Sequence, residues 1–164
     1  MSNSENTVGI FTTDADLALR SWDGWLTQVT GISPADAHGR PLIDLFPDLE
    51  TRNMVGRFKR VLTEGVVEVL APAFHHFLIA CAPATASRHY DKMQQRVTIA
   101  PLREEGSIVG TIVTIEDVTA RLDRERDLAE QLTQSEETAR LEAARALYEQ
   151  ESLRCHMPPL YGLG

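Results

Sequence analysis

The side chains most able to bind a cofactor lie mid-chain. His75 and His76 are adjacent in the run VEVLAPAFHHFLIACAP, whose branched and aromatic residues predict a β-strand with a break near Pro72. Neighbours on a strand point to opposite faces, so one imidazole at most would face a pocket. That imidazole could ligate haem iron or hydrogen-bond a ligand. A satisfied or exposed strand histidine is the simpler interpretation.

Cys81 ends the same apolar run, which favours an inert buried thiol over a reactive one. Trp25, Met54 and Phe58 are candidates to line a ligand pocket, although ordinary core packing is the better explanation for them. Gln94 and Gln95 offer polar contacts on a predicted strand, and a surface ladder is the default interpretation. His38, His89 and His156 have no partner at metal-ligand spacing, so we expect no metal site.

Catalytic signatures are missing from the sequence. It has no phosphate-binding glycine loop and no His-Glu-x-x-His, and no Ser/His/Asp order is suggested. We therefore expect that the chain is not an enzyme. The net charge of −8 and the scattered basic residues predict no nucleic-acid partner.

The cysteines and the hydropathy bear on the compartment. The two cysteines, Cys81 and Cys155, are distant and dissimilar, which favours a reducing environment. The polar start lacks a secretory leader, and no apolar run is long enough for membrane insertion. We expect a cytoplasmic protein.

Periodicity and turn residues divide the chain into segments. We expect two strands over 8–22, short helices over 23–46, one helix over 49–64, and strands over 67–83, 86–105 and 107–119. From Ala120 the composition becomes rich in Ala, Leu, Glu and Arg, without Pro or Gly. Thr133 to Ser135, followed by two acids, predict a helix start there. We therefore expect two helices, 120–132 and 136–150.

The order of these elements resembles the PAS fold of bacterial sensors. Within SWDGWLTQVTGISPADAHGRPLIDLFP, a set of positions falls in the order usual for that family, with Asp23 where Asn is frequent: Trp22, Thr30-Gly31, Ser33, Asp36, Gly39-Arg40-Pro41 and Leu45-Phe46-Pro47. The ending IEDVTARLDRE is similar to the Asp-Ile-Thr end of PAS domains. There, Asp117, Thr119 and Arg121 would form a signal junction, with Thr119 capping the next helix.

The resemblance implies an α+β fold, with a five-stranded antiparallel sheet, helices on one face, and C-terminal helices. It implies a sensory module that binds a small molecule or partner and relays a change to those helices. The alternative is a ligand-free module for protein–protein interaction and dimerisation. Haem and flavin are disfavoured, because residues 49–64 contain no His and the Asn-Cys-Arg-Phe-Leu-Gln stretch of light sensors is missing. The cofactor, if any, stays unknown.

The same reasoning divides the chain. We expect a flexible N-terminus over 1–7, a PAS domain over 8–119, signalling or linker helices over 120–150, and a tail over 151–164 that is either a truncation or an addition. The segment QLTQSEETARLEAARAL weakly resembles the opening of a HEAT-type repeat. We expect a homodimer, with an unidentified small molecule or downstream protein as further partner.

Overall fold

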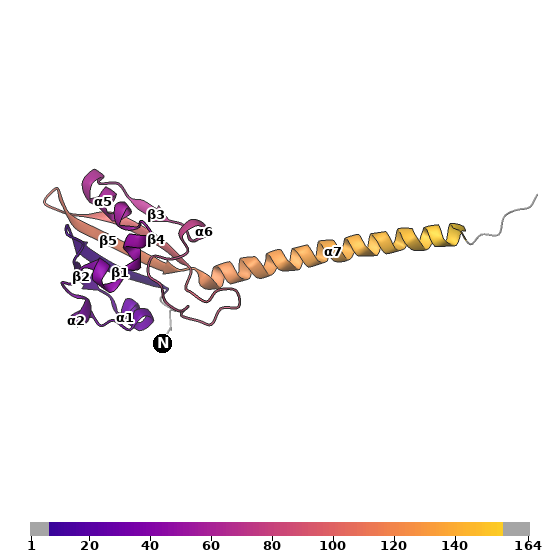
Figure 1. Ribbon diagram of the computed structural model, residues 1–164, viewed down its shortest axis with the longest axis horizontal. Helices are drawn as coiled ribbons and strands as arrows, with labels where there is room; N and C mark the ends of the chain where they lie inside the picture. Colours follow the sequence, from indigo (N-terminus) through magenta and orange to yellow (C-terminus); the bar gives the residue numbers. More distant parts are fainter. Residues whose placement is uncertain (1–6, 156–164) are drawn as a thin grey trace, which may run out of the picture. The chain divides into compact units, whose positions relative to one another are not determined.

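A five-stranded antiparallel sheet forms the centre of the computed structural model, which describes residues 7–155. The strand order along the sheet is β2-β1-β5-β4-β3 (Figure 1). The predicted α+β fold is thereby confirmed. The strands are β1 (Val8–Asp14), β2 (Leu19–Trp22), β3 (Glu68–Leu70), β4 (Gln95–Glu104) and β5 (Ser107–Asp117).

The predicted N-terminal hairpin is present. The Asp14 carboxylate accepts from the backbone N–H groups of Asp16 and Ala18, both at 2.9 Å, and so closes the turn between β1 and β2. Leu17 takes a positive φ of 64° there and is buried. The second hairpin, β4–β5, turns through Glu105 and Gly106, both with positive φ.

Short helices connect β2 to β3, and their caps follow the sequence signals. Asp23 accepts from Leu26 N at 2.9 Å and from Ile10 N at 2.8 Å, so it both caps α1 and holds it against β1. Ser33 caps the next helix by accepting from Asp36 N. The helices are α1 (Gly24–Thr30), α2 (Pro34–Ala37), α3 (Leu42–Leu45), α4 (Asp48–Thr51) and α5 (Val55–Glu64).

The core fills the space between the sheet and α5. Phe58 and Val61 of α5 are fully buried, as are Val97 of β4 and Val113 of β5. Burying a side chain of this size stabilises a domain by roughly 1.5–3 kcal/mol relative to exposure.

The helix predicted over 49–64 is broken in the structure. Asn53 adopts a φ of 61°, and α4 and α5 lie on either side of the break. At the break the guanidinium of Arg52 donates to the carbonyl oxygens of Phe77 (2.6 Å) and Leu78 (3.2 Å). It also lies 4.7 Å from the ring centre of Phe77. The helical spacing of apolar residues gave no sign of this break. Arg52, at the end of α4, is anchored to the segment after α6 by these hydrogen bonds.

The long strand predicted over 67–83 is wrong. Only Glu68–Leu70 form β3, and Pro72–His75 form the short helix α6. His76 ends this helix with a φ of 63°. Pro72 explains the switch, because proline at the first position starts a helix and cannot donate to a ladder.

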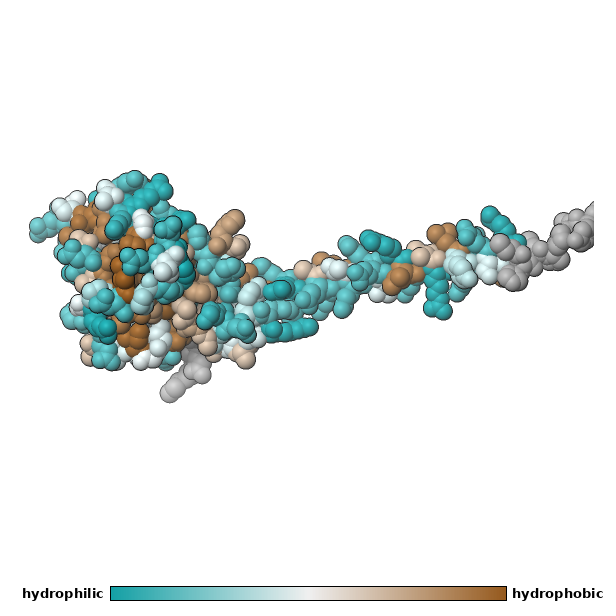
Figure 2. Space-filling model, viewed as in Figure 1, coloured by the Kyte–Doolittle hydropathy of each residue, from teal (hydrophilic) through white to brown (hydrophobic). Residues whose placement is uncertain are grey.

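A single continuous helix, α7 (Thr119–Cys155), replaces the two helices predicted over 120–132 and 136–150. The Thr133 hydroxyl donates to the carbonyl oxygen of Ala129 at 3.0 Å, so it lies along the helix wall and caps nothing. Without a helix pair, the HEAT-type resemblance is not supported. Figure 2 shows polar residues dominating the surface of α7.

The chain divides into two compact units, residues 1–123 and 124–164, so the first turn of α7 belongs to the sheet-containing unit. None of the helices described over 7–155 combines the length and the apolar content that crossing a membrane requires.

Candidate functional site: a cavity beside the first turn of helix α7

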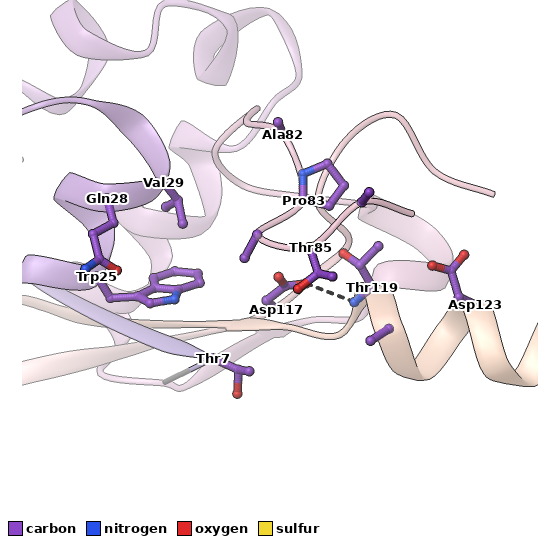
Figure 3. Close-up of a pocket in the computed structure, with 13 residues that line it drawn as sticks. Thr7, Trp25, Gln28, Val29, Ala82, Pro83, Thr85, Asp117, Thr119 and Asp123 are labelled. Atoms are coloured by element: carbon purple, nitrogen blue, oxygen red, sulfur yellow. Dashed lines mark hydrogen bonds between the residues drawn. The ribbon is translucent and has the colours of Figure 1, made fainter. Parts of the chain in front are cut away.

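A cavity of about 770 Å³ lies at the junction between β5 and α7 (Figure 3). Four parts of the first unit border this open cavity: α1, the loop over 82–86, the residue before β1 and the β5–α7 junction. The lining residues are Thr7, Trp25, Gln28, Val29, Ala82, Pro83, Ala84, Thr85, Ala86, Asp117, Thr119, Ala120 and Asp123.

Trp25 contributes the largest side chain of this lining. Only 6% of the residue is exposed, and its indole lies toward the interior of the cavity in Figure 3. Trp22 is equally buried, and its Nε1 donates to the Ile32 carbonyl oxygen at 3.0 Å. The Nε1 of Trp25 has no such acceptor within residues 7–155. In the described part of the chain no fully enclosed side-chain nitrogen lacks a partner, so this N–H borders the cavity.

Asp117 and Thr119 join the sheet to α7. Asp117 Oδ1 accepts from the Thr119 backbone N–H at 3.0 Å, the hydrogen bond drawn in Figure 3. The Thr119 hydroxyl accepts from Gln94 N at 2.8 Å, and Val118 N donates to the Gln94 carbonyl oxygen. Asp117 therefore caps the helix, and the cap role predicted for Thr119 is wrong. Thr119 instead ties the helix start to the residue before β4.

Asp123, one turn further along α7, holds the loop that forms the cavity wall. Its Oδ2 accepts from the Ser87 hydroxyl at 2.7 Å, and its Oδ1 accepts from the His89 backbone N–H at 3.2 Å. Ser87 in turn accepts from Tyr90 N at 3.0 Å. The loop and the first turn of α7 are thus held together by a carboxylate.

The electrostatic character of the cavity is acidic. Asp117 and Asp123 are the ionisable groups of its lining, which contains no Lys, Arg or His among the residues described. Asp117 Oδ2 has no hydrogen-bond partner within 7–155. The cavity therefore offers one bare carboxylate oxygen and one bare indole N–H.

The other predicted pocket residues lie elsewhere. Met54 and Phe58 belong to the buried core. His75 and His76 lie at the end of α6 and not on opposite faces of a strand, which corrects the sequence-based interpretation. Burial and the nearby charges of Arg57 and Arg52 lower the pKa of His75. Trp25 is the pocket candidate that lines the cavity.

Cys81 is half-buried, between Met93 and Gln95. Its Sγ lies 3.9 Å from the Met93 sulfur and 3.7 Å from Gln95 Nε2. Burial, followed by the charge of Asp117, raises the pKa of this thiol to about 11. A thiol with this pKa carries little thiolate at neutral pH, which agrees with an inert cysteine.

Gln94 and Gln95 are buried, so the predicted surface ladder is wrong. Gln95 Oε1 accepts from Leu78 N and Ile79 N, and its Nε2 donates to the Ile79 carbonyl oxygen. One side-chain amide thus satisfies backbone groups of the segment after α6. Arg121, the third residue of the predicted junction, is exposed on the first turn of α7.

The loop residues and Asp123 were not predicted from the sequence. The loop lacks a periodic pattern, and Asp123 looks like one more acid in a charged helix. The only sequence signal was the cluster of small residues over 80–87, which breaks a strand pattern.

No protein-family model matches the chain, and no curated protein matches it. Solved structures do. A sensory box sensor histidine kinase from Vibrio cholerae is 14% identical with a TM-score of 0.56, over 70% of this chain and 84% of that one. An RNA-binding Light-Oxygen-Voltage receptor is 21% identical with a TM-score of 0.52, over 83% of this chain and 36% of that one.

The VqmA dimer of Vibrio cholerae is 16% identical with a TM-score of 0.52, over 69% of this chain and 47% of that one. At such identities the likeness shows the fold. The chain has a PAS-like fold, the architecture of sensory domains in sensor kinases and receptors, with a long helix after its last strand.

Proposed function

We propose that this chain is a sensory module in which the cavity beside α7 receives the signal and the start of α7 transmits it. The observation that carries the proposal is the shared position of Asp117. Its carboxylate lines the cavity and also caps the helix. A ligand that binds the free Oδ2 can move the carboxylate and so change the helix start, because both oxygens belong to the same side chain.

The loop wall provides a second connection. Asp123 binds Ser87 and the backbone of His89, so a ligand that displaces the loop pulls on the first turn of α7. Neither connection requires the core to open.

A cavity-filling variant tests the relay without a ligand. Thr85→Trp places a large side chain on an exposed loop position of the lining, and Thr63→Trp is the matched control on the exposed face of α5. We expect amide hydrogen exchange over 120–132 to change in the first variant and to match the unaltered protein in the second. Equal exchange over 120–132 in both variants would contradict the relay.

The second candidate function is a ligand-free interaction and dimerisation module. The filled core favours it, because Phe58, Val97 and Val113 have no exposed surface between the sheet and α5. Native mass spectrometry of freshly purified protein discriminates the two functions. A small molecule that is retained by the native protein and lost from a Trp25→Ala variant supports sensing.

Under either candidate we propose a non-enzymatic role and a homodimer assembled partly through α7. The VqmA protein, which shares the fold, is a dimer. The exposed leucines of α7 offer apolar surface for pairing with a second copy. The cytoplasmic location stays a prediction of the sequence.

A further inference from the structure

We infer that the cavity beside α7 binds a small organic cation: an ammonium compound that carries a hydrogen-bond acceptor and an apolar body. This inference rests on the proposed sensory function of the same cavity and names the chemistry of its ligand. Three features of the lining, taken in turn, determine that chemistry.

Charge selects a cation. The lining carries two carboxylates, Asp117 and Asp123, and no basic side chain among its described residues. Asp123 uses both oxygens to hold the loop, whereas Asp117 leaves Oδ2 without a protein donor. An ammonium group at Asp117 makes the charge-assisted hydrogen bond that this oxygen lacks. An anionic ligand would face both carboxylates with no cation to offset them.

The indole of Trp25 selects an acceptor on the same molecule. Its N–H borders the cavity and has no acceptor within residues 7–155, although the residue is 94% buried. Because this N–H is reached from the cavity, a ligand oxygen that accepts from Nε1 replaces water there and adds the modest net gain of one hydrogen bond. The indole face also attracts an ammonium group placed near it.

The remaining wall selects an apolar body. Val29 and Pro83 face the cavity together with Trp25, and the alanines of the loop add small apolar surface. A volume of about 770 Å³ holds a molecule much larger than a single ammonium ion. An aromatic or branched group fits this wall, because apolar surface removed from water contributes about 25 cal/mol per Å².

Four small probes separate these features. 2-Amino-1-phenylethanol has the ammonium, the hydroxyl acceptor and the ring. Phenethylamine lacks the hydroxyl, 1-phenylethane-1,2-diol lacks the ammonium, and mandelate is anionic. At pH 7 the aliphatic amines are protonated. Isothermal titration calorimetry on the full chain should show that the amino alcohol binds about tenfold more tightly than the diol, with no binding of mandelate.

Two variants assign the residues. Asp117→Asn removes the charge but keeps an oxygen that can cap Thr119 N, so the helix start is retained. We expect it to weaken binding of the amino alcohol about tenfold, whereas Asp44→Asn, the same change at an exposed site on α3, leaves it unaltered. Trp25→Phe should abolish the preference for the amino alcohol over phenethylamine, because that preference needs the indole N–H.

The results that overturn the inference are specific. Tighter binding of the diol or mandelate, equal affinities for Asp117→Asn and Asp44→Asn, or no binding of the amino alcohol at its solubility limit would each do so. Amide exchange measured on the same samples keeps the two proposals apart. If the amino alcohol binds but amide exchange over 120–132 does not change, the proposed relay to α7 is contradicted and the ligand chemistry is not. If Thr85→Trp changes amide exchange over 120–132 but the amino alcohol does not bind, the inferred cationic ligand is contradicted and the relay is not.

Discussion

The sheet-containing unit and the C-terminal helix are stabilised in opposite ways. Between Val8 and Thr119, helix caps, tight turns and a buried core all stabilise the same fold. Side chains such as Phe11 and Phe58 are fully buried there. Along α7, Leu132 stays 66% exposed and Tyr148 stays 73% exposed. Tertiary packing determines the first region. Helix propensity without Gly or Pro determines the second from Arg124 onward.

The largest difference between the regions is expected in their response to truncation of an apolar side chain. Phe58→Ala, in the core, should lower the free energy of unfolding by about 3–5 kcal/mol, because it removes a buried ring and leaves a cavity. Leu141→Ala, on exposed α7, should lower it by less than about 0.5 kcal/mol at protein concentrations where the chain is monomeric. Urea unfolding followed by circular dichroism measures both.

The second prediction concerns what covers α7. The stripe Leu122, Leu128, Ala129 and Leu132 is expected to pair with the same stripe of a second copy. A deletion of residues 127–164 keeps Asp123 and its loop contacts, and it should lower dimer affinity while the core stays folded. Light scattering at several protein concentrations measures the effect. A monomer mass for the full chain at every concentration would contradict pairing of this stripe between two copies.

The third prediction tests the boundary between the regions. Asp117→Ala removes the helix cap and should cost about 1 kcal/mol, a loss that a domain of this size survives. Amide exchange should rise over 120–132 and stay low in β4 and β5. Glu116→Ala, at the neighbouring position of β5, is the control. A uniform rise in exchange across the sheet would assign Asp117 to the core instead.

The smallest predicted effect is a pH dependence at His75. Burial and two arginines lower its folded pKa, so the unfolded chain binds a proton more readily. The stability that neutral His75 contributes is present above its unfolded pKa, near 6.5, and is lost as the pH falls through the lower folded value. His75→Asn should therefore reduce the loss of thermal stability between pH 7 and 5. An unchanged pH profile would argue against this assignment.

The elements that the sequence predicts correctly are those whose structure is decided by local chemistry. Asp23 and Ser33 act as caps because a short acceptor before a helix works in any context, and the β4–β5 turn follows from Glu105-Gly106. The wrong predictions concern elements whose structure depends on groups distant in the sequence. The break at Asn53 accompanies an anchor between Arg52 and the segment after α6, which no local pattern encodes.

The residues of the candidate site show the same difference between local motifs and distant contacts. Asp117 and Thr119 were found because a motif marks them, although their roles changed: Thr119 bonds Gln94, a residue 25 positions earlier. Trp25 was found as a large apolar side chain. Asp123 and the loop over 82–86 could not be found, because their importance comes from a contact between segments more than 30 residues apart.

The continuity of α7 gives the helix a defined angular phase. An α-helix turns about 100° per residue, so a single insertion after Asp123 would rotate every downstream side chain by that angle while leaving the cavity untouched. Inserting seven residues restores nearly the original orientation. The orientation of any protein fused after Arg154 would therefore depend on the length of the helix as well as on the state of the domain. The activity of such a fusion should vary periodically with the number of residues inserted.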